Sequence, residues 1–357
     1  MNAGPTCQDE DFFKRSFFIG FSGGLDSTVL THALMQVAQV LPIEARRLNA
    51  IHVNHRLQPA AIKFERHCRE MAETLGIQLT VKRPAAVKGQ AVQLGLEASA
   101  RLRRYSAFEE VMGVKPQRQQ ARRSEPLARR LSAKEKSGSS WPVLVLAHHA
   151  NDQVETALLQ WMRGAGLEGL SAMPMLSSRQ GYFLWRPLLQ LTRSTLEDYA
   201  SCLKLPFVED PSNGLPDQDR NRLRQQVFPV LSAMRPGAVA AMARSVQHLQ
   251  KARQLLDQLD QDDLSLCTHS IHGLCLEPFL GLPVERQLRT LRAWLVGHQG
   301  VSGAIMPPAR RLEEFLRQLR TARNGRRPVL AVKTPSTGGS PSFRVRLRAG
   351  FLTVEWI

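Results

Sequence analysis

The chain has 357 residues, of which 43% are hydrophobic, and this length and composition predict two or three domains with apolar cores. Its 48 Lys and Arg outnumber its 31 Asp and Glu and leave a net charge of +17. This surplus predicts a polyanionic partner, although a basic surface that serves only solubility would give the same count. Five scattered cysteines include no CxxC pair, which argues against an iron–sulfur or structural zinc site and favours a reducing cytoplasm. No apolar run approaches the roughly 20 residues of a membrane span, so the sequence predicts a soluble cytoplasmic protein with no membrane partner.

The first predicted element is a strand at residues 17–21, followed by Ser22-Gly23-Gly24-Leu25-Asp26-Ser27 and then by a helix at 28–40. Adjacent glycines let backbone amides approach an anion, the serines add hydroxyl donors, and the start of the helix adds partial positive charge. A Walker loop would have Lys after its last glycine, where this chain has Leu25-Asp26. A magnesium ion explains a carboxylate among phosphate donors, so Asp26 is a predicted metal ligand in a nucleotide-binding loop. A serine- and glycine-rich turn without a ligand is the alternative.

Strand-like and helix-like segments alternate beyond this loop, which predicts an α/β fold with a doubly wound, mostly parallel sheet. The further predicted strands are 47–53, 78–81 and 143–147, with a helix at 59–75. In such sheets, ligands bind at the carboxyl ends of the strands. Polar clusters follow two more of these strands, namely His52, Asn54 and His55 after the second strand and residues 148–152 after the last one. We therefore expect both clusters to share one site with the loop.

A helix start at residues 96–105 carries three arginines within four positions. Arg101 and Arg104 are three residues apart and share a helix face, and paired guanidinium groups suit a phosphate or a carboxylate. A surface helix with ordinary salt bridges is the alternative.

Residues 113–140 differ abruptly in composition from the rest of the chain. They hold eight basic residues and two acidic ones, few large apolar side chains, and a Ser137-Gly138-Ser139-Ser140 end. Such a segment cannot build a core, so we expect a mobile insertion between a helix and a strand. It either contacts RNA phosphates or is functionally neutral.

The segment Ala147 to Thr156 crosses a strand-to-helix junction and contains two carboxylates three residues apart, Asp152 and Glu155. This spacing lets both point at one metal ion or one ammonium group. His148 lies one turn earlier and is a candidate for orienting a substrate or a phosphate. Helix capping is the alternative, with Asn151 or Asp152 as the cap and Glu155 completing a capping box.

The pattern becomes mainly helical after Ser212, with predicted helices at 220–231, 238–259, 283–296 and 307–319. Before this region, residues 163–170 form a glycine-rich loop. Arg220, Arg222 and Arg224 at the first helix start are candidate phosphate-backbone contacts. Residues 343–357 alternate around Ala349-Gly350, which predicts a terminal hairpin.

Taken together, these segments resemble the tRNA(Ile)-lysidine synthetases, which belong to the N-type ATP pyrophosphatases, or PP-loop superfamily. The resemblance rests on the order SGGLDS, HVNHRLQ, EASARLRRY, AHHANDQVET, RGAGLEGL, RPLL, EDPSN and RNRLR across residues 17–231. It implies a PP-loop catalytic domain at 1–215, a helical tRNA-binding domain at 216–325 and a short β tail at 326–357.

The resemblance also implies the reaction. ATP would adenylylate the C2 oxygen of the wobble cytidine in the AUA-reading isoleucine tRNA, which has a CAU anticodon, and free L-lysine would then displace AMP to give lysidine. Residues 22–27 with His52, Asn54 and His55 would bind ATP, Asp26 would bind Mg2+, and Arg101 and Arg104 would neutralise phosphate charge. His148, Asp152 and Glu155 would complete the catalytic set.

Two departures from the family pattern concern individual residues. Many members have two adjacent aspartates where this chain has Asn151-Asp152, and the family often has Leu-Arg where this chain has Arg56-Leu57-Gln58. Three alternatives remain at this point. A PP-loop tRNA thiolase would use paired cysteines, an amide-forming synthetase would not need the basic surplus, and a non-catalytic RNA-binding protein would leave Asp26 and Glu155 without a role.

Overall fold

The computed structural model describes residues 10–40, 47–54, 61–84, 96–114, 141–179, 181–209, 219–269, 273–299, 307–321, 328–333 and 341–356. These residues divide into two compact units, the first ending at Lys251 and the second beginning at Ala252. The predicted domain limits of 1–215, 216–325 and 326–357 stay a prediction. Of the predicted insertion, residues 115–140 lie outside the described residues.

The first unit is built on a six-stranded sheet, and five of its strands are parallel. The strands are β1 (Phe17–Gly20), β2 (Leu48–Val53), β3 (Gln78–Lys82), β4 (Val143–Val145), β5 (Leu176–Arg179) and β6 (Tyr182–Trp185). Their order is β3-β2-β1-β4-β6-β5, and only β5 is antiparallel to its neighbour. The predicted doubly wound, mostly parallel sheet is therefore confirmed.

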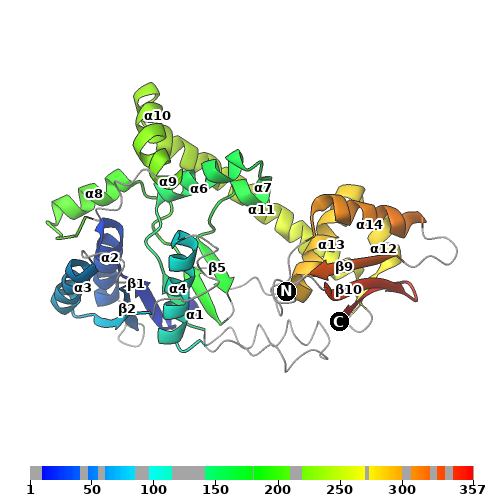
Figure 1. Ribbon diagram of the computed structural model, residues 1–357, viewed down its shortest axis with the longest axis horizontal. Coiled ribbons are helices and arrows are strands. Elements are labelled where there is room, and N and C mark those ends of the chain that lie inside the picture. The colour runs from blue at the N-terminus through cyan, green and yellow to red at the C-terminus, as the bar shows by residue number, and fades with distance from the viewer. Residues whose placement is uncertain are drawn as a thin grey trace. The chain divides into compact units, whose positions relative to one another are not determined.

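Both faces of this sheet are covered, because alternate residues of its strands are apolar on each side. Phe17 and Ile19 of β1 belong to one core with α2 (Leu25–Val40), α3 (Ala61–Leu75) and α8 (Arg193–Cys202). Phe18 belongs to a second core with Phe108 of α4 (Leu96–Val111). Figure 1 shows α2 and α3 on one side of the strands and α4 on the other.

The winding of the sheet reverses at β1. The chain runs from β1 outward through β2 and β3, and then returns to the other side of β1 to form β4 and β6. The helices that follow β1 and β4, α2 and α6 (Ala150–Met162), therefore both begin at the carboxyl edge where the two halves of the sheet meet. This switch point is the usual ligand position in such folds.

The rest of the first unit is helical: α1 (Glu10–Phe13), α7 (Leu167–Leu170), α9 (Asp219–Arg222), the π-helical segment η4 (Leu223–Val227), α10 (Phe228–Met234) and the first part of α11 (Ala238–Cys267). The sequence predicted one continuous helix at 220–231, and the structure interrupts it with η4. Pro229 stands at the start of α10. It lacks an amide hydrogen and its ring obstructs the carbonyl of residue 225, so the preceding turn widens. The β5–β6 hairpin and α8 were not predicted.

The second unit packs the last part of α11 and three further helices against an antiparallel sheet. The strands are β7 (Thr268–His269), β8 (Gly273–Cys275), β9 (Val329–Lys333), β10 (Pro341–Arg348) and β11 (Phe351–Trp356), in the order β7-β8-β11-β10-β9. The helices are α12 (Leu276–Gly281), α13 (Val284–Gln299) and α14 (Ala309–Thr321). The predicted terminal hairpin is confirmed as β10–β11, with Ala349 and Gly350 at positive φ angles of 46° and 83° in its turn.

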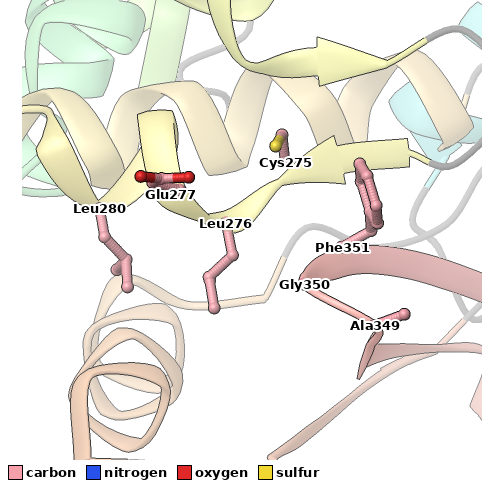
Figure 2. Close-up of a pocket in the computed structure, with 7 residues that line it drawn as sticks. All are labelled: Cys275, Leu276, Glu277, Leu280, Ala349, Gly350 and Phe351. Carbon is pink, nitrogen blue, oxygen red and sulfur yellow. The ribbon is translucent and has the colours of Figure 1, made fainter.

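An open pocket in this second unit lies between the start of α12 and the β10–β11 turn (Figure 2). Cys275, Leu276, Glu277, Leu280, Ala349, Gly350 and Phe351 line it. None of the predicted site residues is among them. In the part of the chain that the structure describes, no helix is both long and apolar enough to cross a bilayer.

Candidate active site

Ser27 holds the loop between β1 and α2 in shape. Its Oγ accepts hydrogen bonds from the backbone N–H groups of Ser22 at 3.2 Å and Gly23 at 3.1 Å, and lies 2.9 Å from Ser22 Oγ. The Ser27 side chain is buried. This serine therefore organises the amides of the loop from inside, in addition to its predicted role as a phosphate donor.

Gly23 is required by both backbone angle and packing. Its φ is +86°, a region that side chains rarely adopt, and a Cβ at this position would lie 2.9 Å from Cys68 Sγ on α3. The Gly23 carbonyl also accepts a hydrogen bond of 3.0 Å from the N–H of Val208. Gly24 differs, because a Cβ there would have no neighbour closer than 3.7 Å.

The end of β2 is fixed by an internal polar network, and the predicted ATP contacts of His52 and Asn54 stay a prediction. His52 Nδ1 lies 2.9 Å from the carbonyl oxygen of Phe21, and burial lowers the His52 pKa, so the neutral ring donates this hydrogen bond. Asn54 Nδ2 donates to Glu65 Oε2 at 2.9 Å. Burial acts to raise the pKa of Glu65, but hydrogen bonds from Arg83, Asn54 and Arg69 outweigh it and lower that pKa to about 2. His55 lies outside the described residues.

A capping box closes the first turn of α6, but it consists of other residues than those predicted from the sequence. His149 is the N-cap, its Nδ1 accepting from the N–H of Asn151 at 3.2 Å, and Asp152 Oδ2 accepts from the N–H of His149 at 3.0 Å. Capping by Asn151 or Asp152 with Glu155 in the box is therefore wrong. Because Nδ1 accepts, the proton of the neutral ring is on Nε2, which lies 3.7 Å from both Asp26 Oδ2 and Asp152 Oδ2.

Asp152 and Glu155 come together as their spacing predicted, and Arg224 of η4 lies between them. Arg224 Nη2 donates to Asp152 Oδ1 and to Glu155 Oε2, each at 3.0 Å, and its Nε donates to Glu155 Oε1. Burial raises the pKa of Glu155, whose side chain is fully buried, more than Arg224 lowers it. Arg224 is thus turned into the site, whereas the sequence suggested an RNA phosphate contact.

Other predicted polar residues are found around the group formed by Asp152, Glu155 and Arg224. Asn151 Oδ1 accepts from the N–H of Arg193 at 3.0 Å and so ties α6 to the start of α8. His148 is half-buried, and burial lowers its pKa to about 4. Arg101 and Arg104 lie at exposed positions of α4, with the Arg101 guanidinium 5.7 Å from the centre of the Tyr105 ring.

The acidic side of the loop suits a divalent cation shared with phosphate oxygens. Asp26 Oδ1 is buried and has no hydrogen-bond partner among the described residues, while burial raises the pKa of this carboxyl above its usual value. Within the described ranges, no group of three or more His, Cys, Asp or Glu side chains is arranged to hold a metal ion. Mg2+ commonly takes one or two carboxylates plus phosphate oxygens and water, and the Asp26 carboxylate could supply one such ligand.

A glycine-containing loop with an internal aspartate lies at the switch point of a parallel sheet, as expected for a PP-loop protein. Residues 6–121 and 127–231 match the PP-loop domain family, and the chain belongs to it. Residues 274–352 match the TilS substrate binding domain. The particular relatives are tRNA(Ile)-lysidine synthases, so the resemblance predicted from the motifs is confirmed.

Three of these relatives show how far the similarity extends. The synthase of Pseudomonas aeruginosa is 39% identical over 287 residues, which cover 78% of this chain and 58% of the relative. That of Coxiella burnetii is 36% identical, covering 89% and 63%, and that of Yersinia pseudotuberculosis 35% identical, covering 90% and 64%. The chain therefore spans about three fifths of the length of the curated relatives that it matches.

Proposed function

We propose that this protein ligates free L-lysine to C2 of the wobble cytidine of an isoleucine tRNA with a CAU anticodon. The reaction uses ATP, passes through an adenylylated cytidine, and gives lysidine, AMP and pyrophosphate. Membership of the PP-loop family and similarity to tRNA(Ile)-lysidine synthases support the reaction class. The observation that carries the proposal is the 3.7 Å approach of His149, the N-cap of α6, to Asp26, which brings the proposed phosphate-binding and acidic halves of the site together.

The loop half would bind and release pyrophosphate. The amides of Ser22 and Gly23 donate to Ser27 Oγ in the substrate-free protein, which fixes the loop, and the start of α2 would present partial positive charge to the phosphates. Bound Mg2+, held by Asp26 and phosphate oxygens, would neutralise charge on the leaving pyrophosphate. Arg101 and Arg104, exposed on α4, would add positive charge as the phosphoryl oxygens become more negative.

The acidic half would receive the amine nucleophile. Asp152 and Glu155 supply negative charge for an ammonium group, and Arg224 fixes the orientation of both carboxylates. With its pKa lowered to about 4, His148 is neutral at pH 7 in the substrate-free protein. Its role in this proposal is therefore to orient the nucleophile by a hydrogen bond rather than to supply charge.

The net charge of +17 supports a polyanionic substrate, for which Lys and Arg side chains supply the non-specific part of the affinity. The second unit, which carries the match to the TilS substrate binding domain, is the expected tRNA-binding part.

The test is the dependence of ATP consumption on both substrates. Purified protein is incubated with ATP, with lysine and isoleucine tRNA supplied separately or together, and AMP and pyrophosphate are measured over many turnovers. We expect sustained release only when both are present. Sustained ATP cleavage without lysine would contradict the ligase assignment, and tRNA binding without any turnover would favour the non-catalytic RNA-binding alternative.

A further inference from the structure

A cluster of arginines surrounds Tyr105 beside the proposed lysine site. Arg186 directly follows β6, which is parallel to β4, so it lies at the same carboxyl edge as His148. Helix α4 connects two parallel strands and runs opposite to them, so its early residue Arg101 also lies near this edge. Arg101 and Arg179 both place their guanidinium groups against the Tyr105 ring, at 5.7 and 4.9 Å from its centre.

Arg186 is the buried centre of this cluster, with only 4% of its surface exposed. Its Nη1 donates to the carbonyl of Pro174 at 2.9 Å, Tyr105 lies near its side chain, and its Nε has no partner among the described residues. Burial and the nearby positive charges of Arg179 and Arg101 lower the Arg186 pKa. A buried guanidinium is costly unless an anion completes its hydrogen bonds.

Among the side chains that the structure describes, neither Arg179 nor Arg186 forms an ion pair with a carboxylate. Arginine is well suited to planar oxyanions, which accept two parallel hydrogen bonds from one guanidinium. The cluster thus has the composition of an oxyanion subsite rather than of a structural salt-bridge network.

Charges of both signs act on His148. The charges that act on it are the negative charge of Asp152 and the positive charges of Arg186, Arg101 and Arg220. Its Nδ1 is buried and has no hydrogen-bond partner in the described part of the chain. Charges of both signs beside one unpartnered imidazole nitrogen suit an amino acid, which carries an ammonium and a carboxylate group.

We propose that Arg186, together with the Tyr105 hydroxyl, binds the α-carboxylate of the free lysine. This inference rests on the proposed function, and it assigns the group that selects an amino acid over a simple amine. A small carboxylate can reach a guanidinium that is 4% exposed more readily than a phosphodiester of a folded tRNA can. Contact of Arg186 with an RNA phosphate is the competing outcome of the test.

The test compares lysine with cadaverine, the same diamine without the carboxylate, as nucleophiles for the tRNA. In the wild-type protein we expect kcat/KM for lysine to exceed that for cadaverine by about tenfold or more, as a charged hydrogen bond allows. Arg186→Gln should lower kcat/KM for lysine by about tenfold or more and change that for cadaverine by less than about twofold. The ratio of kcat/KM for lysine to kcat/KM for cadaverine should therefore fall towards one.

Two further variants separate this effect from a general loss of structure. Tyr105→Phe keeps the ring that Arg101 and Arg179 contact but removes the hydroxyl near Arg186. The lysine-to-cadaverine ratio of kcat/KM should therefore fall by a smaller factor than in Arg186→Gln, and this variant tests the proposal even if Arg186→Gln does not fold. Arg66→Gln, at a side chain 74% exposed on α3, should leave the ratio unchanged. The Kd for ATP should be the same in all folded variants.

An equal loss for lysine and cadaverine, or a weaker Kd for tRNA in Arg186→Gln, would overturn the carboxylate assignment. If the wild-type protein transfers neither nucleophile to the tRNA, the proposed function itself fails, which is a different result from an unchanged ratio in the variants.

Discussion

His149 Nε2 lies 3.7 Å from Asp26 Oδ2, and through this approach the first turn of α6 meets the loop after β1. The same nitrogen lies 3.7 Å from Asp152 Oδ2, so one imidazole separates two carboxylates that come from different strand ends. The ring carries its proton on this nitrogen, because the other nitrogen accepts a backbone hydrogen bond. Asp26 and Asp152 are thereby held close to each other without a direct contact.

Asp26→Asn should lower the rate of lysidine formation by about 100-fold or more, because the site loses the carboxylate proposed to hold Mg2+ against the phosphates. Thermal stability should stay the same or rise, since burial and the nearby Asp152 both disfavour the charged form of Asp26. Turnover assays and thermal unfolding check the two expectations. Full activity in this variant would show that the loop assignment is wrong.

Arg224→Gln should destabilise the first unit by about 3–5 kcal/mol, because it leaves the buried carboxylates of Asp152 and Glu155 without their positive partner. The double variant Arg224→Gln, Glu155→Gln should recover part of this loss. Denaturant unfolding of the wild type, both single variants and the double variant gives the coupling energy. Additive effects would mean that the ion pair does not stabilise the site.

The adjacent glycines of the loop should respond differently to alanine. Gly23→Ala should cost about 1–3 kcal/mol in unfolding free energy, because it combines a φ of +86° with a 2.9 Å contact to Cys68. Gly24→Ala has neither problem and serves as the matched control, with a change of about 0.5 kcal/mol or less. Similar losses at both positions, measured by denaturant unfolding, would contradict the described loop conformation.

Glu65→Gln should lower stability at pH 7 by about 2–4 kcal/mol, since Glu65 accepts hydrogen bonds from Arg83, Arg69 and Asn54. The Glu65 pKa is lowered from 4.5 to about 2 on folding, so the unfolded chain binds this proton first as pH falls. The stabilisation of the folded state by ionised Glu65 is complete above about pH 4.5 and is lost as pH falls towards 2.

Unfolding of wild type and Glu65→Gln across this pH range should therefore show a difference that narrows at low pH. Glu70→Gln, at a side chain 66% exposed on the same helix, is the control and should show a small difference at every pH. A wild-type advantage that persists near pH 2 would contradict the low pKa of Glu65.

The parts that the sequence predicted correctly depend on short-range patterns. Alternating apolar strands and amphipathic helices predicted the parallel sheet, and the spacing of Asp152 and Glu155 predicted that both carboxylates share a helix face. The β5–β6 hairpin has strands of only four residues, too short for a clear period. The interruption at η4 depends on how Pro229 is accommodated within a longer helical pattern.

The missing parts of the site depend on contacts between distant segments. Arg224 is 69 residues from Glu155, so no local spacing could show that this arginine faces a carboxylate pair rather than RNA. The sequence likewise could not show that Arg186 lies near His148 and Tyr105, because this depends on the pairing of β6 with β4. One feature of the sequence could have indicated the contact of Arg224. The arginines at 220–224 were candidate partners for Asp152 and Glu155, for which the sequence predicted no basic partner.

The central claim is tested most directly by the mass of the wobble nucleoside. Isoleucine tRNA with a CAU anticodon is incubated with the purified protein, ATP and isotopically labelled lysine, and then digested to nucleosides for mass analysis. The account predicts that the wobble cytidine gains the mass of lysine less one water, carries the label, and does so only when ATP is present. Unmodified cytidine in a tRNA that the protein binds, under conditions where ATP is available, would contradict it.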